Sequence, residues 1–266
     1  MNILVTLNSG YLKQLVVMLT SLCENNNCNI ELYIMHNSLK TEELKKIGEI
    51  SPKLHINSVF IDDDFLKDAP TTARYPREMY FRIFACKILP QSIDKILYLD
   101  PDIVIINSLE NLYNVDLGSC LIGAASHLKE TGVMNKLNEL RLSMHQGTSY
   151  VNSGVILFNL KEFRENLAEE EIFSFIKKYK QLLILPDQDI LNGVFGYCIL
   201  NINTLLYNLS DRVMVIHNVN PLNINKKISL DWVRRNTKII HYCGRNKPWN
   251  DNYLGELDVF YKQFES

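Results

Sequence analysis

Apolar and polar residues alternate along the chain in blocks that predict strands and helices in turn. An apolar run over residues 2–7 ends at Asn8, and from Tyr11 to Leu22 leucine and valine recur at helical spacing. This first unit therefore predicts a strand, a loop and a helix. The same order returns with expected strands at 30–35 and 54–60 and, between them, a helix that opens at Thr41.

The alternation continues to the end of the chain. Further strands are expected at 121–125, 150–158, 202–206 and 213–216 and from Lys238 onward. Helices are expected at 77–89, between loops in 126–149, at 163–179, directly after Leu185 and at 251–266. Strands separated by helices predict an α/β fold with a Rossmann-like, mostly parallel sheet flanked by helices, whose ligands bind at the carboxyl ends of the strands. No repeat or linker divides the 266 residues, so we expect a single domain over 1–266.

Composition narrows the classes of partner and compartment. The 28 basic residues nearly balance the 30 acidic ones, which argues against nucleic acid as a partner. Six cysteines are scattered without paired spacing, and the N-terminal apolar run is too short for an export signal, so we expect reduced thiols and a cytoplasmic protein. No apolar stretch has the length of a transmembrane segment, but exposed side chains could hold the protein on the inner face of a membrane.

The strongest chemical signal is a pair of acids inside an apolar segment. Residues 96–99 and 103–105 are apolar, and between them stand Asp100, Pro101 and Asp102. Residues two apart in extended backbone point to one side, so the two carboxylates can converge on a cation such as Mn²⁺ or Mg²⁺. The alternative is a polar Asp-Pro turn that merely joins two strands.

For several other polar residues the sequence allows two roles, contact with a ligand or a structural role such as a salt bridge or a helix cap. Arg82 is expected either in a surface salt bridge or facing a polyanionic ligand. Gly154 interrupts a buried strand next to Asn152, which is typical of a strand that approaches a ligand or another backbone closely. Asp187 and Gln188 open an apolar helix, where Asp187 is either a cap or a ligand contact. The acidic run 62–64 is interpreted as solvated surface.

A last group of candidates follows the strand that begins at Lys238. It brings His241, Gly244 and Lys247 within a few residues of one another. Glycine lets backbone amides approach a phosphate and lysine neutralises its charge, so this mixture suits a phosphate site.

Taken together, these motifs resemble the retaining glycosyltransferases of family 8, which use nucleotide sugars and adopt the GT-A fold with a DxD motif. The resemblance covers nearly the whole chain. It rests on Ile3-Leu4-Val5-Thr6 with Tyr11, Tyr80-Phe81-Arg82, Leu97-Tyr98-Leu99-Asp100-Pro101-Asp102, Tyr150-Val151-Asn152-Ser153-Gly154, Asp187-Gln188-Asp189-Ile190-Leu191-Asn192, His241-Tyr242-Cys243-Gly244 and Lys247-Pro248-Trp249. By this resemblance, residues 1–105 form a nucleotide-binding part, 106–250 an acceptor and sugar part, and 251–266 a C-terminal helix.

The resemblance also implies a role for each motif. The metal ligands would be Asp100, Asp102 and His241, which hold Mn²⁺, with Mg²⁺ as the alternative ion. UDP would be contacted by Thr6, Asn8, Tyr11, Asp100, Asp102, Gly244 and Lys247. The donor sugar would meet Arg82, Asn152, Asp187 and Gln188, of which Gln188 and Asp187 are the expected catalytic residues. Asn8 departs from the family, whose members often carry Asp at this position.

The expected activity is transfer of a hexose, with retention of configuration, from UDP-glucose or UDP-galactose to a glycan, glycolipid or glycoprotein acceptor. Two alternatives are a glycogenin-like protein that glucosylates itself and a nucleotidyltransferase that makes sugar nucleotides. The second should show a glycine-rich basic loop after the first strand, and residues 7–11 are not one. We also expect 69–80 and 244–249 to close over the donor, because Arg82 and Lys247 would have little to neutralise without it.

Overall fold

A computed structural model describes the chain except for residues 63, 65–77, 127–131, 146, 167–168 and 266. Its strands are β1 (Asn2–Thr6), β2 (Ile30–His36), β3 (Leu54–Phe60), β4 (Lys95–Leu99), β5 (Ile103–Ile105), β6 (Ile122–Ser126), β7 (Val151–Asn159), β8 (Ile199–Ile202) and β9 (Ile239–His241). Its α-helices are α1 (Leu12–Asn25), α2 (Thr41–Gly48), α3 (Glu78–Phe81), α4 (Ala85–Ile88), α5 (Glu110–Tyr113), α6 (Gly132–Leu142), α7 (Leu160–Asn166), α8 (Glu169–Tyr179), α9 (Pro186–Phe195), α10 (Thr204–Tyr207), α11 (Asp211–Val219), α12 (Leu230–Asn236) and α13 (Asp258–Tyr261).

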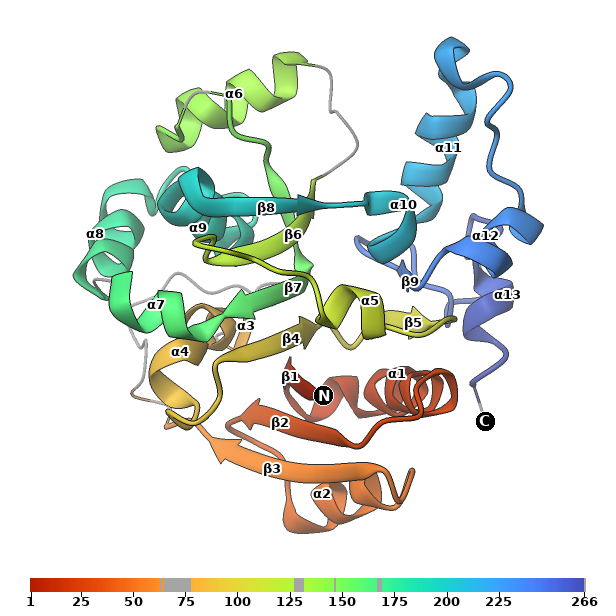
Figure 1. The fold of residues 1–266 in the computed structure, drawn as a ribbon, viewed down its shortest axis with the longest axis horizontal. Coiled ribbons are helices and arrows are strands. Elements are labelled where there is room, and N and C mark those ends of the chain that lie inside the picture. Colours follow the sequence, from red (N-terminus) through yellow and green to blue (C-terminus); the bar gives the residue numbers. More distant parts are fainter. Residues whose placement is uncertain (63, 65–77, 127–131, 146, 167–168, 266) are drawn as a thin grey trace.

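Seven of the strands form one sheet in the order β3-β2-β1-β4-β7-β6-β8. The pairs on either side of β1, and the pairs β2·β3 and β6·β8, are parallel, whereas β7 runs antiparallel to both β4 and β6. Helices cover the sheet (Figure 1). The predicted mostly parallel sheet flanked by helices is therefore confirmed, and β7 is the strand that reverses direction.

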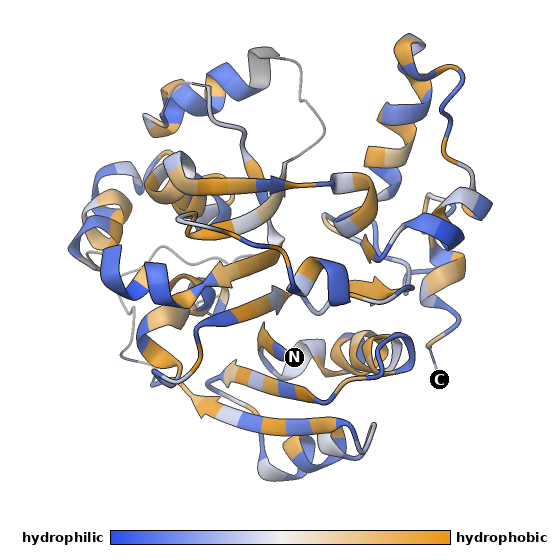
Figure 2. Cartoon of the chain, viewed as in Figure 1, coloured by the Kyte–Doolittle hydropathy of each residue, from blue (hydrophilic) through white to orange (hydrophobic). Residues whose placement is uncertain are grey.

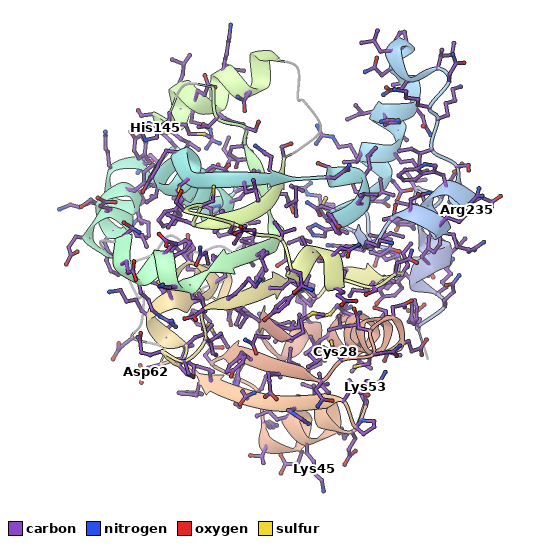
Figure 3. All side chains as sticks on the ribbon, viewed as in Figure 1. Cys28, Lys45, Lys53, Asp62, His145 and Arg235 are labelled. Carbon is purple, nitrogen blue, oxygen red and sulfur yellow. The ribbon has the colours of Figure 1, made fainter. Side chains whose placement is uncertain are left out.

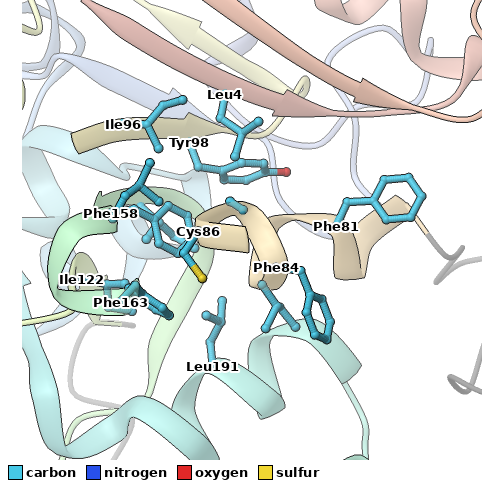
Figure 4. Close-up of a cluster of buried hydrophobic side chains, with 14 of the residues drawn as sticks. Leu4, Phe81, Phe84, Cys86, Ile96, Tyr98, Ile122, Phe158, Phe163 and Leu191 are labelled. Carbon is cyan, nitrogen blue, oxygen red and sulfur yellow. The ribbon is translucent and has the colours of Figure 1, made fainter. Parts of the chain in front are cut away.

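The central strands are apolar on both faces, as expected for a sheet covered on both sides. Leu4, Ile96 and Tyr98 point into one core with Phe84, Phe158, Phe163 and Leu191 (Figure 4). The alternate residues Ile3, Leu97 and Leu99 point into the other core with Leu15 and Leu19 of α1. In Figure 2 the inner strands are accordingly orange along most of their length. Burial on both faces is the reason why the strands show continuous apolar runs.

A second, two-stranded sheet joins β5 to β9 in antiparallel register, with Ile103 opposite His241. The end of the chain after β8 packs on this sheet, and there α11, α12 and α13 contribute to a separate apolar cluster that includes Leu209, Val233, Tyr242 and Phe260. This small sheet brings the end of the chain beside the turn that follows β4.

Several expected elements were wrong or misplaced. The expected strand 213–216 is part of α11, which begins where the Ser210 side chain accepts a hydrogen bond from the Val213 N–H. The expected strand 202–206 ends at Ile202, because Asn203 caps the short helix α10. β-branched residues suggested strands in both places, but side-chain caps start helices there.

Other boundaries differ as well. The helix expected at 77–89 is divided into α3, a 3-10 turn over Arg82–Phe84, and α4. The helix expected at 163–179 is two helices, and the C-terminal helix covers only Asp258–Tyr261. Asp62 lies on the surface as expected (Figure 3), and the loop 69–76 lies outside the described residues. In the part of the chain that the structure describes, no helix combines the length and hydrophobicity needed to traverse a bilayer.

Candidate active site

The acidic pair lies on a turn that links the two sheets. The N–H of Asp100 donates to the carbonyl oxygen of Gly154 in β7 at 2.8 Å, and the N–H of Tyr242 donates to the carbonyl oxygen of Asp102 at 3.0 Å. Asp100 is thus tied to the main sheet and Asp102 to the small sheet. The segment is the polar turn of the alternative interpretation, and that turn also brings the two carboxylates together with His241 from β9.

Asp100, Asp102 and His241 form a compact set of metal-ligand atoms. One atom from each residue lies within 4.8 Å of the other two. His241 Nε2 is 3.2 Å from Asp102 Oδ1 and 3.7 Å from Asp100 Oδ2. Asp102 Oδ1 is buried without a hydrogen-bond donor, an arrangement that is costly unless a cation binds there. Two carboxylates and an imidazole fit a divalent cation.

A chain of amide side chains fixes the ring of His241. The backbone N–H of Gly154 donates to Asn152 Oδ1, so the group of Asn208 that meets this oxygen is its Nδ2. Asn208 Oδ1 then faces His241 Nδ1 at 2.8 Å. A proton of the imidazole therefore lies on Nδ1, and Nε2 is the ring nitrogen that faces the two acids. Asn208 was not predicted, because it stands between two expected strands with no motif around it.

The same chain reaches the start of α9. Asn152 Nδ2 and the backbone N–H of Ser153 donate to Gln188 Oε1 at 3.0 and 3.2 Å. Both lone pairs of the Gln188 carbonyl are therefore used within the protein. The structure thus brings together three residues that the sequence placed on separate elements: His241, Asn152 and Gln188.

Gly154 is required because β7 passes directly beneath these ligands. A Cβ at this position would lie 2.2 Å from His241 Cε1 and 2.8 Å from Asp100 Oδ2. No side chain fits at such distances without moving the ring. The sequence predicted that a ligand or another backbone would approach Gly154, and the structure shows that the groups close to it are the His241 ring and the Asp100 carboxylate.

Arg82 is buried and links the acids of two elements. Its Nη1 donates to Asp100 Oδ1 and to the Ser153 carbonyl oxygen, each at 2.9 Å, and lies 3.5 Å from Asp187 Oδ2. The guanidinium also stacks over the ring of Tyr98. Burial alone would lower the pKa of Arg82, but Asp100, Tyr98 and Asp187 raise it. The surface salt bridge considered for Arg82 is thus wrong, and its charge orients the acidic groups of the site.

Lys247 pairs with the second acid. Its Nζ donates to Asp102 Oδ2 and to the carbonyl oxygen of Tyr242. Burial raises the pKa of Asp102, but His241 and Lys247 outweigh burial and hold that pKa below its usual range. Our expectation that Arg82 and Lys247 have little to neutralise without a donor was therefore wrong. Gly244, which precedes this lysine, has φ +91, a left-handed conformation that favours glycine.

The three polar residues at the start of α9 have separate environments. Asp189 accepts hydrogen bonds from Arg141, from the Tyr150 hydroxyl and from two backbone N–H groups, so it is a structural anchor. Asp187 does not cap the helix, whose N-cap is Leu185. Its Oδ2 is buried without a hydrogen-bond donor, and burial raises its pKa although Arg82 opposes this.

A pocket on the other side of the acids is lined by the expected nucleotide residues. Thr6, Asn8 and Tyr11 border it together with Asp100 and Asp102. The Thr6 hydroxyl lies 3.2 Å from the Tyr98 hydroxyl, and Asn8 Oδ1 accepts the N–H of Gly10. Asn8 can therefore present its Nδ2 as a donor to a ligand. Glu78 and Met79 also line the pocket and were not predicted, because a helix start carries no binding motif.

The pockets follow one another across the acids. A second pocket shares Tyr11, Asp100 and Asp102 with the first and adds Asn152, Asp187, Gln188, Gly244 and Lys247. A third shares Gln188 and His241 with the second and continues to Ser210, Arg212 and Tyr253. The three pockets form a series that begins at the end of β1 and finishes at the start of α11. The candidate metal ligands lie in the middle of this series.

Comparison with known proteins gives concordant results. The sequence model described as "Glycosyl transferase family 8" matches residues 2–253. A lipopolysaccharide 1,2-glucosyltransferase of Escherichia coli strain K12 is 28% identical, over 98% of this chain and 76% of the relative. General stress protein A of Bacillus subtilis strain 168 is 23% identical, over 95% and 88%. The galactosyltransferase LgtC, solved with donor and acceptor sugar analogues, superposes with a TM-score of 0.82 at 21% identity, over 100% and 95%.

Proposed function

The chain belongs to glycosyl transferase family 8, and from this premise we propose that it transfers a hexose, with retention, from UDP-glucose or UDP-galactose to a glycan, glycolipid or glycoprotein acceptor. The observation that carries this proposal is the convergence of Asp100, Asp102 and His241 between two pockets. One pocket suits a nucleotide and the other an acceptor, so the reacting sugar would lie between them.

The donor can be assigned along the pockets by the chemistry of their walls. We place the uridine beside Thr6, Asn8 and Tyr11, because this end offers hydrogen-bond groups and an aromatic ring. The diphosphate belongs at the acids, Gly244 and Lys247, where cationic groups gather. The sugar then lies at Arg82, Asn152, Asp187 and Gln188. Arg82 lines the first pocket and Asp187 the second, while Asn152 and Gln188 line both the second and the third.

Transfer breaks the bond between the anomeric carbon and the diphosphate, so negative charge grows on the leaving group while the sugar becomes oxocarbenium-like. A divalent cation at Asp100, Asp102 and His241 would stabilise that negative charge as a Lewis acid. Lys247 adds a positive charge at the same place, and a charge that acts more strongly on the transition state than on the ground state accelerates the reaction. We favour same-face attack, because Gln188 is a poor nucleophile.

We propose Mn²⁺ as the preferred ion. His241 would contribute a nitrogen ligand through Nε2, which faces the acids. Imidazole suits Mn²⁺ better than Mg²⁺, which prefers oxygen ligands only. Six free cysteines support a reducing, cytoplasmic location for the enzyme.

A panel of UDP-sugars tests the proposal. The protein is incubated with each sugar nucleotide and Mn²⁺, and free UDP is measured with and without carbohydrate acceptors. We expect slow UDP release from UDP-glucose or UDP-galactose, and none from an Asp102→Asn variant. A mass increase of the protein itself would instead identify a self-glucosylating enzyme, and no release from any UDP-sugar would contradict the proposal.

A further inference from the structure

The segment 211–228 forms an arm with an exposed apolar surface. It consists of α11, a 3-10 turn over Pro221–Asn223 and an irregular segment that leads back to Ile228. The arm projects from the body of the molecule (Figure 1). Five of the fifteen large apolar side chains exposed in the described part of the chain lie between positions 215 and 224. They are Val215, Ile216, Val219, Leu222 and Ile224, and Leu222 and Ile224 are 88% and 68% exposed. So dense an apolar surface is typical of an interaction site.

Side-chain hydrogen bonds hold this arm in one conformation. Asn218 exchanges two hydrogen bonds with the backbone of Ile228, and His217 Nε2 lies 2.9 Å from the carbonyl oxygen of Lys226. Asn223 Nδ2 donates to the carbonyl oxygen of His217. Val213 and Met214, on the inner side of α11, are buried in the apolar cluster around Tyr242. The arm is therefore attached at its base and braced along its length, while its outer apolar side chains have no intramolecular partner surface.

Basic residues outnumber acidic ones in the arm and in the helix that follows it. Between positions 211 and 236 there are five basic residues and two acidic ones, in a chain whose formal net charge is −2. Lys226 and Lys227 follow the apolar tip directly, and Arg234 and Arg235 lie on the neighbouring helix α12; all four are exposed. Of the two acids, Asp211 is engaged with Tyr253 and with the backbone of Glu256 and Leu257, and Asp231 lies 4.0 Å from Arg234. Lys226 and Lys227 have no acidic partner among the ion pairs of the described residues, and exposed apolar side chains close to such lysines in the chain match an anionic lipid surface.

We propose that this arm docks the protein on an anionic membrane surface, with Leu222 and Ile224 inserted at the level of the lipid headgroups. Arg212, at the base of α11, lines the pocket that also contains Gln188 and His241. Nine helical residues span about 13 Å, so a membrane at the tip of α11 lies near the mouth of that pocket. A lipid-linked acceptor could then reach the pocket from the surface to which the arm is bound, a consequence that rests on the proposed function.

Sedimentation with vesicles tests the docking without any substrate. The full chain is mixed with phosphatidylcholine vesicles and with vesicles that also contain roughly 30% phosphatidylglycerol. We expect binding to the anionic vesicles that weakens as salt is added, and at least about fivefold less binding for the Leu222→Ser/Ile224→Ser variant and for Lys226→Ala/Lys227→Ala. Both pairs are exposed, so the thermal unfolding midpoint should remain at the wild-type value.

Matched controls use the same chemistry elsewhere on the surface. Phe60→Ser removes an exposed apolar side chain from β3, and Lys45→Ala/Lys46→Ala removes two exposed lysines from α2, which lies apart from the arm (Figures 1 and 3). Neither control should change vesicle binding. Equal binding to neutral and anionic vesicles, or unchanged binding of the two arm variants, would overturn the proposal. So would a concentration-dependent dimer that the Leu222→Ser/Ile224→Ser variant abolishes, since the surface would then pair two copies. Because no donor sugar is present, these outcomes are independent of the proposed activity.

Discussion

The imidazole of His241 donates from Nδ1 to Asn208 Oδ1 at 2.8 Å, and the orientation of both side chains follows from a single backbone group, the N–H of Gly154. That N–H donates to Asn152, so the bonded atom of Asn152 is Oδ1. Asn208 then meets this oxygen with its Nδ2, and its own Oδ1 faces the ring of His241. The fold therefore turns Nε2 of the histidine toward Asp100 and Asp102. Asn208 is a positioning residue, because its side chain bonds to His241 and to Asn152.

Substitution of Asn208 separates its two bonds. In Asn208→Ala the ring loses its partner, and we expect affinity for Mn²⁺ to fall about 10- to 100-fold. In Asn208→Asp the carboxylate still accepts the Nδ1 proton but repels Asn152 Oδ1, so metal affinity should be retained while turnover falls. Titration of Mn²⁺ by electron paramagnetic resonance gives the affinity, and UDP release gives the turnover. Equal loss of both quantities in the two variants would contradict separate roles for the two bonds.

Asp102→Asn should remove turnover while the protein remains folded. The change nearly conserves volume but removes a charged ligand, so Mn²⁺ binding is lost together with UDP release. Each variant should in addition lower stability, by up to about 3 kcal/mol, because Asp100→Asn weakens the pairing of Arg82 and Asp102→Asn that of Lys247. Thermal unfolding of both variants measures this cost and shows that each protein is still folded at the assay temperature. Wild-type activity of either variant at limiting Mn²⁺ is the result that would exclude the metal assignment.

Gly154→Ala should disable the site without disrupting the sheet. The added Cβ would lie 2.2 Å from His241 Cε1, so the rigid ring must move away from the acids. We expect loss of Mn²⁺ affinity and of UDP release by more than about tenfold, comparable with loss of a supporting residue of a metal ligand. Gly196→Ala is the matched control, because its nearest neighbour would be Thr148 Oγ1 at 3.6 Å. Unchanged metal binding in Gly154→Ala would show that the ring is not held where the structure has it.

Because His36 is buried, we expect the protein to lose stability under mildly acidic conditions. Its Nδ1 accepts the N–H of Leu39 and its Nε2 lies 2.8 Å from the Ser58 hydroxyl, and burial lowers its pKa. As the pH is lowered through the ordinary pKa of 6.5, His36 takes up a proton in the unfolded chain before it does so in the folded one. The free energy of unfolding therefore decreases as the pH falls, until the pH is below the pKa of His36 in the folded protein. The unfolding midpoint should therefore drop more in the wild type than in His36→Asn between about pH 7.5 and pH 5.5. Parallel curves for the two proteins would contradict this.

Local patterns predicted much of the fold and of the site. The runs at 2–7 and 96–99 were predicted as strands because they are predominantly apolar. Successive residues such as Leu97 and Tyr98 enter different cores, so both faces of the strand are buried and apolar. The convergence of Asp100 and Asp102 was also predicted, although the reason differs: the acids sit on a turn between two sheets rather than along one extended strand. Their pairing with Gly154 and Tyr242 depends on strand order, which spacing alone does not contain.

What the sequence did not reveal depends on contacts between distant segments. Asn208 joins the candidate site only through its bonds to Asn152 of β7 and His241 of β9, and an isolated asparagine carries no periodic signal. The segment 213–216 was expected as a strand from its β-branched residues, but the cap at Ser210 starts a helix whose outer side remains exposed. For Arg82 the sequence left a surface salt bridge and a ligand-facing cation as alternatives, because its acidic partners are 18 and more residues away.

The final prediction concerns Gln188 and the stereochemistry of transfer. As an expected catalytic residue, Gln188 could stabilise the developing positive charge of the sugar through its carbonyl oxygen, but this oxygen already accepts hydrogen bonds from Asn152 and Ser153. The side chain therefore orients β7 and one edge of the sugar pocket, and Gln188→Ala should lower the rate by about 10²-fold or less.

A covalent route would need a carboxylate nucleophile, and Asp187 is the candidate on α9, because Asp189 is engaged with Arg141 and Tyr150. If Asp187 were that nucleophile, Asp187→Asn would cost about 10⁴-fold or more. The anomeric proton coupling of the first product, measured by NMR from an α-linked donor, decides the stereochemistry: an α-linked product supports retention, whereas a β-linked product would exclude same-face attack and the covalent route alike.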